Sequence, residues 1–224
     1  MMDVSGCRNM ISHEELAKNL LEEKYEECFE IKEVQSQSIF SGYYTVIAYP
    51  EADPELLFKA YIDSDGKAFS DNYAVKKICE ILSDEVAKGL DSVNGIYYIH
   101  TNTVIDMTTS SKIKVDLEEY AGKRSKIFNI YLHYCPENMD VDKLYSAVQN
   151  CFERLNYVSG SLYIYIEEEA MLWRVQQYVE SNDSLYDNYK KLTEPYYKCE
   201  ISFDKGVVET SLVEVKKMMG DLYE

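Results

Sequence analysis

The sequence is poor in the residues and motifs that enzymes use for chemistry. It has only three histidines in 224 residues. It contains no G-x-G-x-x-G, no phosphate loop, no HExxH and no serine nucleophile elbow. None of its six cysteines forms a CxxC pair or stands at metal-site spacing from a histidine. These absences exclude the common nucleotide-binding, zinc-peptidase and serine-hydrolase classes, and we expect no metal and no cofactor.

Basic residues are scarce relative to acidic ones. Lys and Arg together number 23 against 40 Asp and Glu, so the formal net charge is −17. Such a chain repels nucleic-acid phosphates and anionic lipid surfaces. The only compact basic cluster, Lys123-Arg124 with Lys126, is too small for a nucleic-acid footprint. We therefore expect no nucleic-acid partner, and a protein, peptide or glycan suits this surface better.

Long apolar runs are also missing. No window of about 18 apolar residues occurs, so no transmembrane segment is expected. "VSGC" (4–7) has the shape of a bacterial lipobox, but such a signal needs roughly 7–15 apolar residues before the cleavage point. We expect a cytoplasmic protein for the chain as written. The alternative, if residues precede this start, is a cell-surface lipoprotein anchored at Cys7. We expect the cysteines to be reduced thiols, which fits the cytoplasm and the outside of an anaerobe equally.

One acidic stretch, "DSDGKAFSDNY" (63–73), raises the question of a calcium loop. An EF-hand loop starting at its first aspartate needs glycine at the sixth position and glutamate at the twelfth, where Ala74 stands. The glycine comes at the fourth position instead. Asp65-Gly66 is a strong tight-turn signal, because glycine adopts positive φ without cost. The stretch predicts a hairpin turn, a short strand and a helix capped by Asp71.

Hydrophobic periodicity and turn residues predict helices and strands along the whole chain. A capping box, S-x-x-E at Ser12 and Glu15, marks the first helix. The predicted helices span 12–25, 72–88, 140–155, 170–191 and from 207 onward. The predicted strands span 28–34, 43–49, 56–63, 95–101, 126–134, 161–169 and 196–203.

The order of these elements predicts an α+β protein made of two small α/β sandwich domains. Residues 12–101 are expected to form an antiparallel sheet with flanking helices, and residues 113–224 an alternating β/α unit. The polar stretch 102–112 is the expected linker, and residues 1–11 are expected to be disordered. A single continuous sheet is the alternative.

Tyrosine is the compositional oddity, with 21 residues against 7 phenylalanines. Tyrosine suits strands, where its hydroxyl tolerates partial burial, and it is also enriched at binding surfaces. Strand packing and a binding face are therefore both open interpretations. The candidate binding residues, all on predicted strands, are Tyr97, Tyr98, Tyr163 and Tyr165.

Two residue pairs would allow a hydrolase. His133 and Cys135 are two apart on a predicted strand and face the same side, which is the minimum for a thiol and a base. Glu167 and Glu169 would likewise share a face as an acid–base pair or a cation site. The competing interpretations are packed strand residues and a solvated strand edge. No motif surrounds either pair, so no catalytic residue is predicted.

Three stretches near the start share a recognisable pattern: "LLEEKYEECFEI" (20–31), "AYPEADPELLFKAYID" (48–63) and "DNYAVKK" (71–77). Over roughly residues 13–80 this pattern resembles an uncharacterised group of small, often lipoprotein-like proteins from Gram-positive, clostridia-like bacteria. The chain departs from the group at Glu26, where glycine is expected, and in having no signal peptide as written. The resemblance implies no activity and assigns no catalytic residue.

Together these features favour a non-enzymatic module that binds a protein, peptide or glycan, tethered at the cell surface if Cys7 is lipidated. A hydrolase-type enzyme is one alternative. An acidic, immunity-type inhibitor that masks a basic partner is the other.

Overall fold

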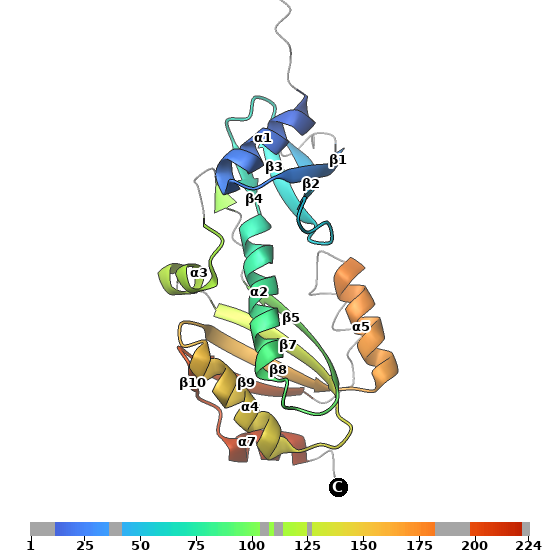
Figure 1. Ribbon diagram of the computed structural model, residues 1–224, viewed down its shortest axis with the longest axis vertical. Helices are drawn as coiled ribbons and strands as arrows, with labels where there is room; N and C mark the ends of the chain where they lie inside the picture. The colour runs from blue at the N-terminus through green and yellow to red at the C-terminus, as the bar shows by residue number, and fades with distance from the viewer. Residues whose placement is uncertain are drawn as a thin grey trace, which may run out of the picture. The chain divides into compact units, whose positions relative to one another are not determined.

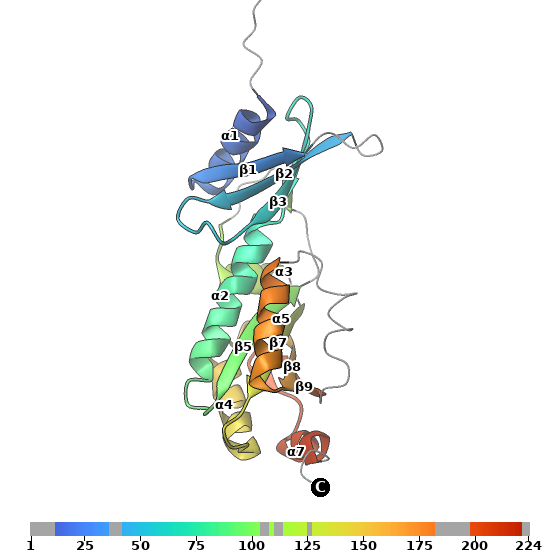
Figure 2. The same cartoon turned by 90° about the vertical axis from the view of Figure 1, so that its right-hand side faces the viewer.

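The computed structural model describes residues 12–35, 42–103, 108–109, 114–124, 127–181 and 198–220. These fall into two compact units, one within Met1–Lys77 and Ile105–Val115, the other within Ile78–Val104 and Asp116–Glu224 (Figures 1 and 2). Each unit has a separate five-stranded sheet. The predicted α+β class is therefore confirmed, and the alternative of a single continuous sheet is wrong.

The first unit is an antiparallel sheet packed against one helix, α1 (His13–Tyr25). Ser12 caps the helix as predicted, because its hydroxyl accepts a hydrogen bond from the Glu15 amide at 3.1 Å, which is the serine half of the predicted capping box. The buried side of α1, including Leu21, packs on the sheet. The strands, in hydrogen-bonding order, are β1 (Phe29–Gln35), β2 (Tyr43–Pro50), β3 (Phe58–Asp63), β4 (Phe69–Asp71) and β6 (Thr108–Thr109).

Four aromatic rings form the centre of the first unit's core. Tyr73 meets Tyr25 edge-on with centroids 4.7 Å apart, and it meets Phe29 edge-on at 5.0 Å. Phe29 in turn meets Phe58 edge-on at 5.6 Å. Such edge-to-face pairs contribute about 0.5–1.5 kcal/mol each beyond the area they bury. They fix the end of α1 against the start of α2 (Tyr73–Gly89).

The acidic stretch 63–73 forms the predicted hairpin turn and helix start. The amide of Asp63 bonds to the Ala68 carbonyl at 3.1 Å, and Gly66 between them adopts φ +72°. The short strand β4 follows. Asp71 then accepts a hydrogen bond from the first amide of α2, that of Tyr73, at 3.0 Å.

The second unit is a mixed sheet in the order β10-β9-β8-β7-β5. Strands β7 and β8 run parallel, joined by helix α4, as parallel neighbours require a crossover connection. The remaining pairs are antiparallel. The elements are β5 (Ile96–Thr103), α3 (Leu117–Arg124), β7 (Ile127–Cys135), α4 (Val141–Arg154), β8 (Ser159–Ile166), α5 (Glu169–Ser181), β9 (Lys198–Asp204), β10 (Val207–Val208) and α7 (Leu212–Gly220).

The two faces of the second sheet differ in chemistry. One face carries apolar side chains on β7 and β8, such as Ile130 and Leu162, both 0% exposed. The helix predicted over 140–155 is present as α4, and its buried side includes Leu144 and Val148. The other face carries tyrosines and histidines, and α5 packs over it through Val175.

Strand β5 lies in a different sheet from the one its sequence position suggested. The prediction grouped 95–101 with the N-terminal strands, but β5 pairs with β7 along its whole length, from Ile96 opposite Cys135 to Thr103 opposite Phe128. Within the expected linker 102–112, residues 102–103 extend β5 and 108–109 form β6; its other residues lie outside the described part. That 12–101 and 113–224 fold as independent domains stays a prediction.

The C-terminal helix starts later than predicted. Val207 and Val208 form β10 and pair with β9, because Lys205 and Gly206 adopt positive φ and turn the chain back. Helix α7 begins only at Leu212.

Helix α5 is described to Ser181, and the rest of the helix predicted over 170–191 lies outside the described residues, as do residues 1–11 with Cys7. No helix in the described ranges combines the length and apolarity needed to cross a bilayer.

Candidate functional site

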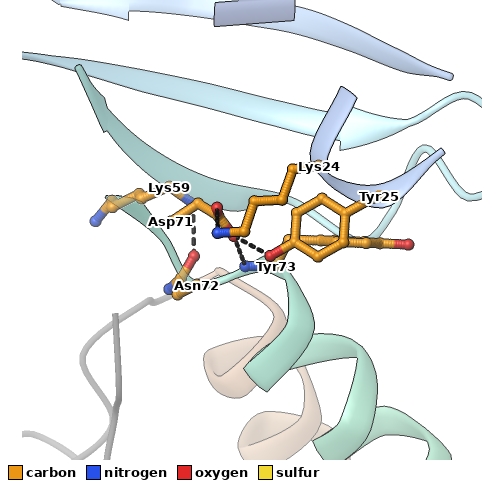
Figure 3. A network of polar contacts seen from close by, with 6 residues as sticks. All are labelled: Lys24, Tyr25, Lys59, Asp71, Asn72 and Tyr73. Carbon is orange, nitrogen blue, oxygen red and sulfur yellow. Dashed lines mark hydrogen bonds and ion pairs between the residues drawn. The ribbon is translucent and has the colours of Figure 1, made fainter. Parts of the chain in front are cut away.

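The first candidate is a buried polar cluster in the first unit, centred on Asp71 (Figure 3). Lys24 Nζ, from the last turn of α1, lies 2.6 Å from Asp71 Oδ2. The Tyr25 hydroxyl donates to Oδ1 at 2.6 Å, and the Tyr73 amide donates to the same oxygen at 3.0 Å. The carboxylate thus joins α1, β4 and α2 through three hydrogen bonds.

The cluster is closed to solvent. Lys24 is 5% exposed and Asp71 is 0% exposed. Burial lowers the pKa of Lys24 below its ordinary value, and the neighbouring Asp71 carboxylate opposes that effect. A buried ion pair adds little net stability, but removing one partner leaves the other charge buried and uncompensated, which is costly. With both charges enclosed and bonded to each other, the arrangement suits holding three elements together and offers no base or nucleophile to a substrate.

Two of the stretches that carry the sequence resemblance meet in this cluster. Lys24 and Tyr25 belong to the first, while Asp71, Asn72 and Tyr73 belong to the last. Asn72 also takes part in the architecture, because its Oδ1 accepts the Lys59 amide at 2.8 Å (Figure 3). The shared pattern therefore marks how this unit is built.

The second candidate is an aromatic array on the face of the second sheet that α5 covers. Neighbouring strands place two rows of rings side by side. The rows are Tyr98, His133 and Tyr165, then His100, Tyr131 and Tyr163. His133 stacks on Tyr165 with centroids 5.1 Å apart, and His100 stacks on Tyr131 at 4.8 Å. His100 and His133 stack at 5.4 Å, which links the rows.

A histidine–glutamate pair is enclosed within this array. His133 Nδ1 lies 2.7 Å from Glu167 Oε1, and both side chains are 0% exposed. The Glu167 amide bonds to the Tyr134 carbonyl at 3.0 Å, which fixes Glu167 just beyond the end of β8. A carboxylate on Nδ1 selects the tautomer that carries its proton there. Glu167 Oε2 is buried, and within the described residues it has no hydrogen-bond partner.

The array does not form a metal site. His100 and His133 lie parallel at 9°, so their ring nitrogens do not converge on one point. Within the described ranges, no three His, Cys, Asp or Glu side chains gather in a way that would hold a metal ion. Burial, together with the nearby His133, lowers the pKa of His100 well below its ordinary value, so this ring is neutral near pH 7.

The four candidate tyrosines divide between the two faces of the sheet. Tyr98, Tyr163 and Tyr165 lie in the array, where Tyr165 is buried and the other two are half-buried. Tyr97 lies on the opposite face, and its hydroxyl donates to the Ala87 carbonyl at 3.2 Å. Burial, aided by Asp91, raises the pKa of Tyr97. The structure therefore brings three of the four together.

Of the two hydrolase pairs, His133 with Cys135 shares a strand face as predicted, and Glu167 with Glu169 does not. His133 and Cys135 do share a strand face, but Nδ1 of His133 is bonded to Glu167 and the ring is fully buried. The strand predicted over 161–169 ends at Ile166, so Glu169 is an exposed residue of α5 rather than a strand neighbour of buried Glu167. The pairing that does occur, His133 with Glu167, was missed because the two residues are 34 positions apart in the sequence. The only signal was that each belonged to one of the two candidate pairs.

A hollow of about 470 Å³ lies between the start of α4 and the end of α7. The charged groups lining it include Asp142 and Lys216, which pair with each other at 2.6 Å. The residues around it include no histidine, cysteine or serine. Both of its aspartates already have partners, because Asp140 accepts the Lys143 amide at 2.9 Å as the cap of α4 and Asp142 pairs with Lys216.

Comparison with known proteins supports the fold. Neither a protein-family model nor a curated protein matches the sequence. The chain is similar in structure to a DUF5037 family protein from Ruminococcus gnavus, with a TM-score of 0.67 and 13% identity over 93% of this chain and 99% of that one. At that identity the likeness shows the fold alone. Its clostridia-like source agrees with the bacterial group that the N-terminal stretches resemble, and it says nothing of lipoprotein character.

Proposed function

We propose that this chain is a non-enzymatic interaction protein that binds a protein partner through its second unit. The observation that carries the proposal is the exposure of aromatic side chains there. Trp173, the single tryptophan of the chain, is 51% exposed on α5, and Tyr97 and Tyr98 are half-buried on β5. Tryptophan and tyrosine are the residue types that most often dominate binding energy at protein interfaces.

The hydrolase alternative has weaker support from the same unit. A general base must come within hydrogen-bond reach of the proton it removes. His133 is 0% exposed, and its Nδ1 is bonded to an equally buried Glu167. Cys79 and Cys199 are buried thiols whose pKa burial raises to about 12 and about 11, so neither is an activated nucleophile.

The net charge of −17 favours a partner that presents a basic surface. The immunity-type inhibitor considered above is one protein of this kind. The exposed aromatic side chains favour a protein partner over a glycan only together with this charge, since aromatic rings also stack on sugars. A partner whose binding weakens as salt is raised would fit the proposal.

Site-specific photo-crosslinking in cells of the native host tests this proposal. A photoreactive phenylalanine analogue is introduced at Tyr98, at Trp173 and, as a matched control, at Tyr43, which is 38% exposed in the first unit. We expect one discrete adduct of the same mass from Tyr98 and Trp173 and none from Tyr43. Adducts from Tyr43 alone, or from none of the three positions, would contradict binding through the second unit.

The compartment in which the partner is met is a separate proposal, because Cys7 lies outside the described residues. We propose the cytoplasm, with a lipid anchor on Cys7 as the alternative. Cell fractionation with an intact mass of the N-terminal peptide decides between them. Membrane-bound protein with a lipid-sized mass increase on Cys7 would establish the anchor, and soluble protein with an unmodified thiol would exclude it.

A further inference from the structure

Resting on the proposed function, we propose that β5 is the accepting edge: an extended segment of the partner adds to the second sheet alongside β5. The segment is apolar in its middle and basic at the end that lies beside Ile96. This mode, in which a peptide joins a sheet by main-chain hydrogen bonds, takes its affinity from the backbone and its specificity from alternate side chains.

The first support is that β5 is an outer strand that is open to solvent. Among the described residues its only strand partner is β7, on one side. Ile99 of β5 is half-buried although its partner Leu132 on the same face is 1% exposed. Figure 2 draws β5 at the margin of the sheet, between α2 and α5. An outer strand of this kind presents a row of main-chain donors and acceptors.

The second support is that β5 has none of the features by which proteins block an edge. Its eight residues, IYYIHTNT, include no lysine, no carboxylate and no proline, and its register with β7 is continuous. His100, the one titratable base in it, is buried. In a chain with 28% charged residues, an uncharged edge of this length stands out.

The other outer strands of both sheets are blocked or short. β1 carries Glu30, Lys32 and Glu33, and its register with β2 shifts between Ile31 and Glu33. Charges and irregular register are the usual protections of an exposed edge. β6 and β10 are only two residues long. Of the described strands, β5 is the long edge left without these protections.

The third support is the charge around the Ile96 end of β5, which indicates the partner's chemistry. Asp91 lies 3.5 Å from the Tyr97 hydroxyl and is exposed. Glu137 is exposed two residues after Cys135, the partner of Ile96. Glu168 is exposed directly after Glu167, whose amide bonds to Tyr134 on β7. Asp91, beside β5 itself, is the carboxylate nearest to the incoming segment. Glu137 and Glu168 follow β7 and β8 and lie further from the edge, where they add to the negative charge at this end of the sheet. Lysine or arginine at the end of the segment beside Ile96 complements that charge.

A second copy of this chain is a poorer occupant of the edge. Each copy carries a net charge of −17, so two copies repel one another. Each would also bring its own carboxylates toward the edge, where a basic segment is the complementary one.

Selection from a display library of random peptides on the full chain tests the proposal. We expect enriched peptides with alternating β-branched or aromatic residues and with lysine or arginine at one end. N-methylation of the synthesised peptide should weaken binding about tenfold or more at every second amide and have little effect at the amides between them, because successive strand amides point to opposite sides. This pattern does not depend on any variant of the protein folding.

Protein variants supply the matched comparison. Ile99→Lys places a charge on the β5 edge and should weaken binding of the selected peptide about tenfold or more. Ile31→Lys places the same charge on the outer strand of the first sheet and should leave binding unchanged.

The outcomes separate the two proposals. A selected peptide that binds with no alternation on N-methylation and no loss in Ile99→Lys would overturn the edge while leaving an interaction protein standing. Dimers that sedimentation detects in the wild type and not in Ile99→Lys would make a second copy the occupant, which also overturns it. Absence of any enriched peptide would overturn the edge, and the crosslinks from Tyr98 and Trp173 would then decide the proposed function by themselves.

Discussion

The two units of this protein use their buried charges and their outer strands in opposite ways. In the first, Asp71 accepts three hydrogen bonds, and the outer strand β1 carries Glu30, Lys32 and Glu33. In the second, Glu167 has one oxygen with no described partner, and the outer strand β5 carries no charged residue. The polar groups of the first unit are committed to its own architecture. We assign binding to the second unit because it exposes Trp173 and has a long outer strand without charge.

The largest expected effect is that of Asp71→Asn. The asparagine side chain must place its NH2 group where one of the two Asp71 carboxylate oxygens lies. Hydrogen-bond donors already point at both oxygens, Lys24 at Oδ2 and Tyr25 with the Tyr73 amide at Oδ1, so two donors would face each other. The substitution also removes the carboxylate charge that lies 2.6 Å from the buried Lys24 ammonium. We expect the free energy of unfolding to fall by about 3–5 kcal/mol, measured by urea denaturation. A loss below about 1 kcal/mol would mean that the cluster does not hold the unit together.

A smaller effect is expected for Glu167→Gln, the matched change in the second unit. Here the amide can place its NH2 group where Oε2 accepts no described hydrogen bond, and its oxygen can keep the bond from His133. We expect a loss of about 1–2 kcal/mol, measured in the same denaturation series. If Glu167→Gln costs as much as Asp71→Asn, the contrast between a saturated and an unsaturated carboxylate is wrong.

The pH dependence of stability should report on His100. Burial holds its folded-state pKa well below the ordinary value of 6.5, so below pH 6.5 the unfolded chain takes up a proton that the folded chain does not. The free energy of unfolding should therefore fall as pH drops below 6.5, by up to about 1.4 kcal/mol per pH unit. His100→Gln should flatten this slope between pH 6.5 and 5. An unchanged slope in the variant would assign the effect to other groups.

The smallest effect is expected at the first unit's surface. Lys18 pairs with Glu30 at 2.8 Å, but both side chains are partly exposed to water. Exposed pairs contribute little, because water and salt screen them. Glu30→Gln should leave the thermal midpoint unchanged within error, and a clear drop would show that β1 depends on this charge for more than blocking its edge.

What the sequence predicted correctly was local. The helix cap at Ser12, the turn at Asp65-Gly66 and the helix α4 each depend on residues within a few positions of one another. Side-chain type and spacing determine such features directly. The late start of α7 is a local feature that was missed, although Ser211 and Glu214 form the S-x-x-E cap that marks it.

What could not be predicted was long-range. Asp71 meets Lys24 across 47 positions, and Glu167 meets His133 across 34. Neither pair leaves a spacing signal, because the sheets bring the partners together. The same holds for β5, whose alternation predicted a strand but could not indicate that its neighbour is β7 rather than a strand of the first sheet. Tyr97 and Tyr98 are adjacent on a strand, so the sequence alone places them on opposite faces, but only the structure shows that Tyr98 lies on the face that α5 covers.

Amide hydrogen exchange along β5 in the free protein tests the central claim most directly. An open edge has every second amide pointing away from β7, so alternate amides between Ile96 and Thr103 should exchange rapidly while those between them are protected. The amides of β8, which has a strand on each side, provide the protected reference. Uniform protection along β5, equal to that of β8, would show that the edge is already occupied and would contradict the account.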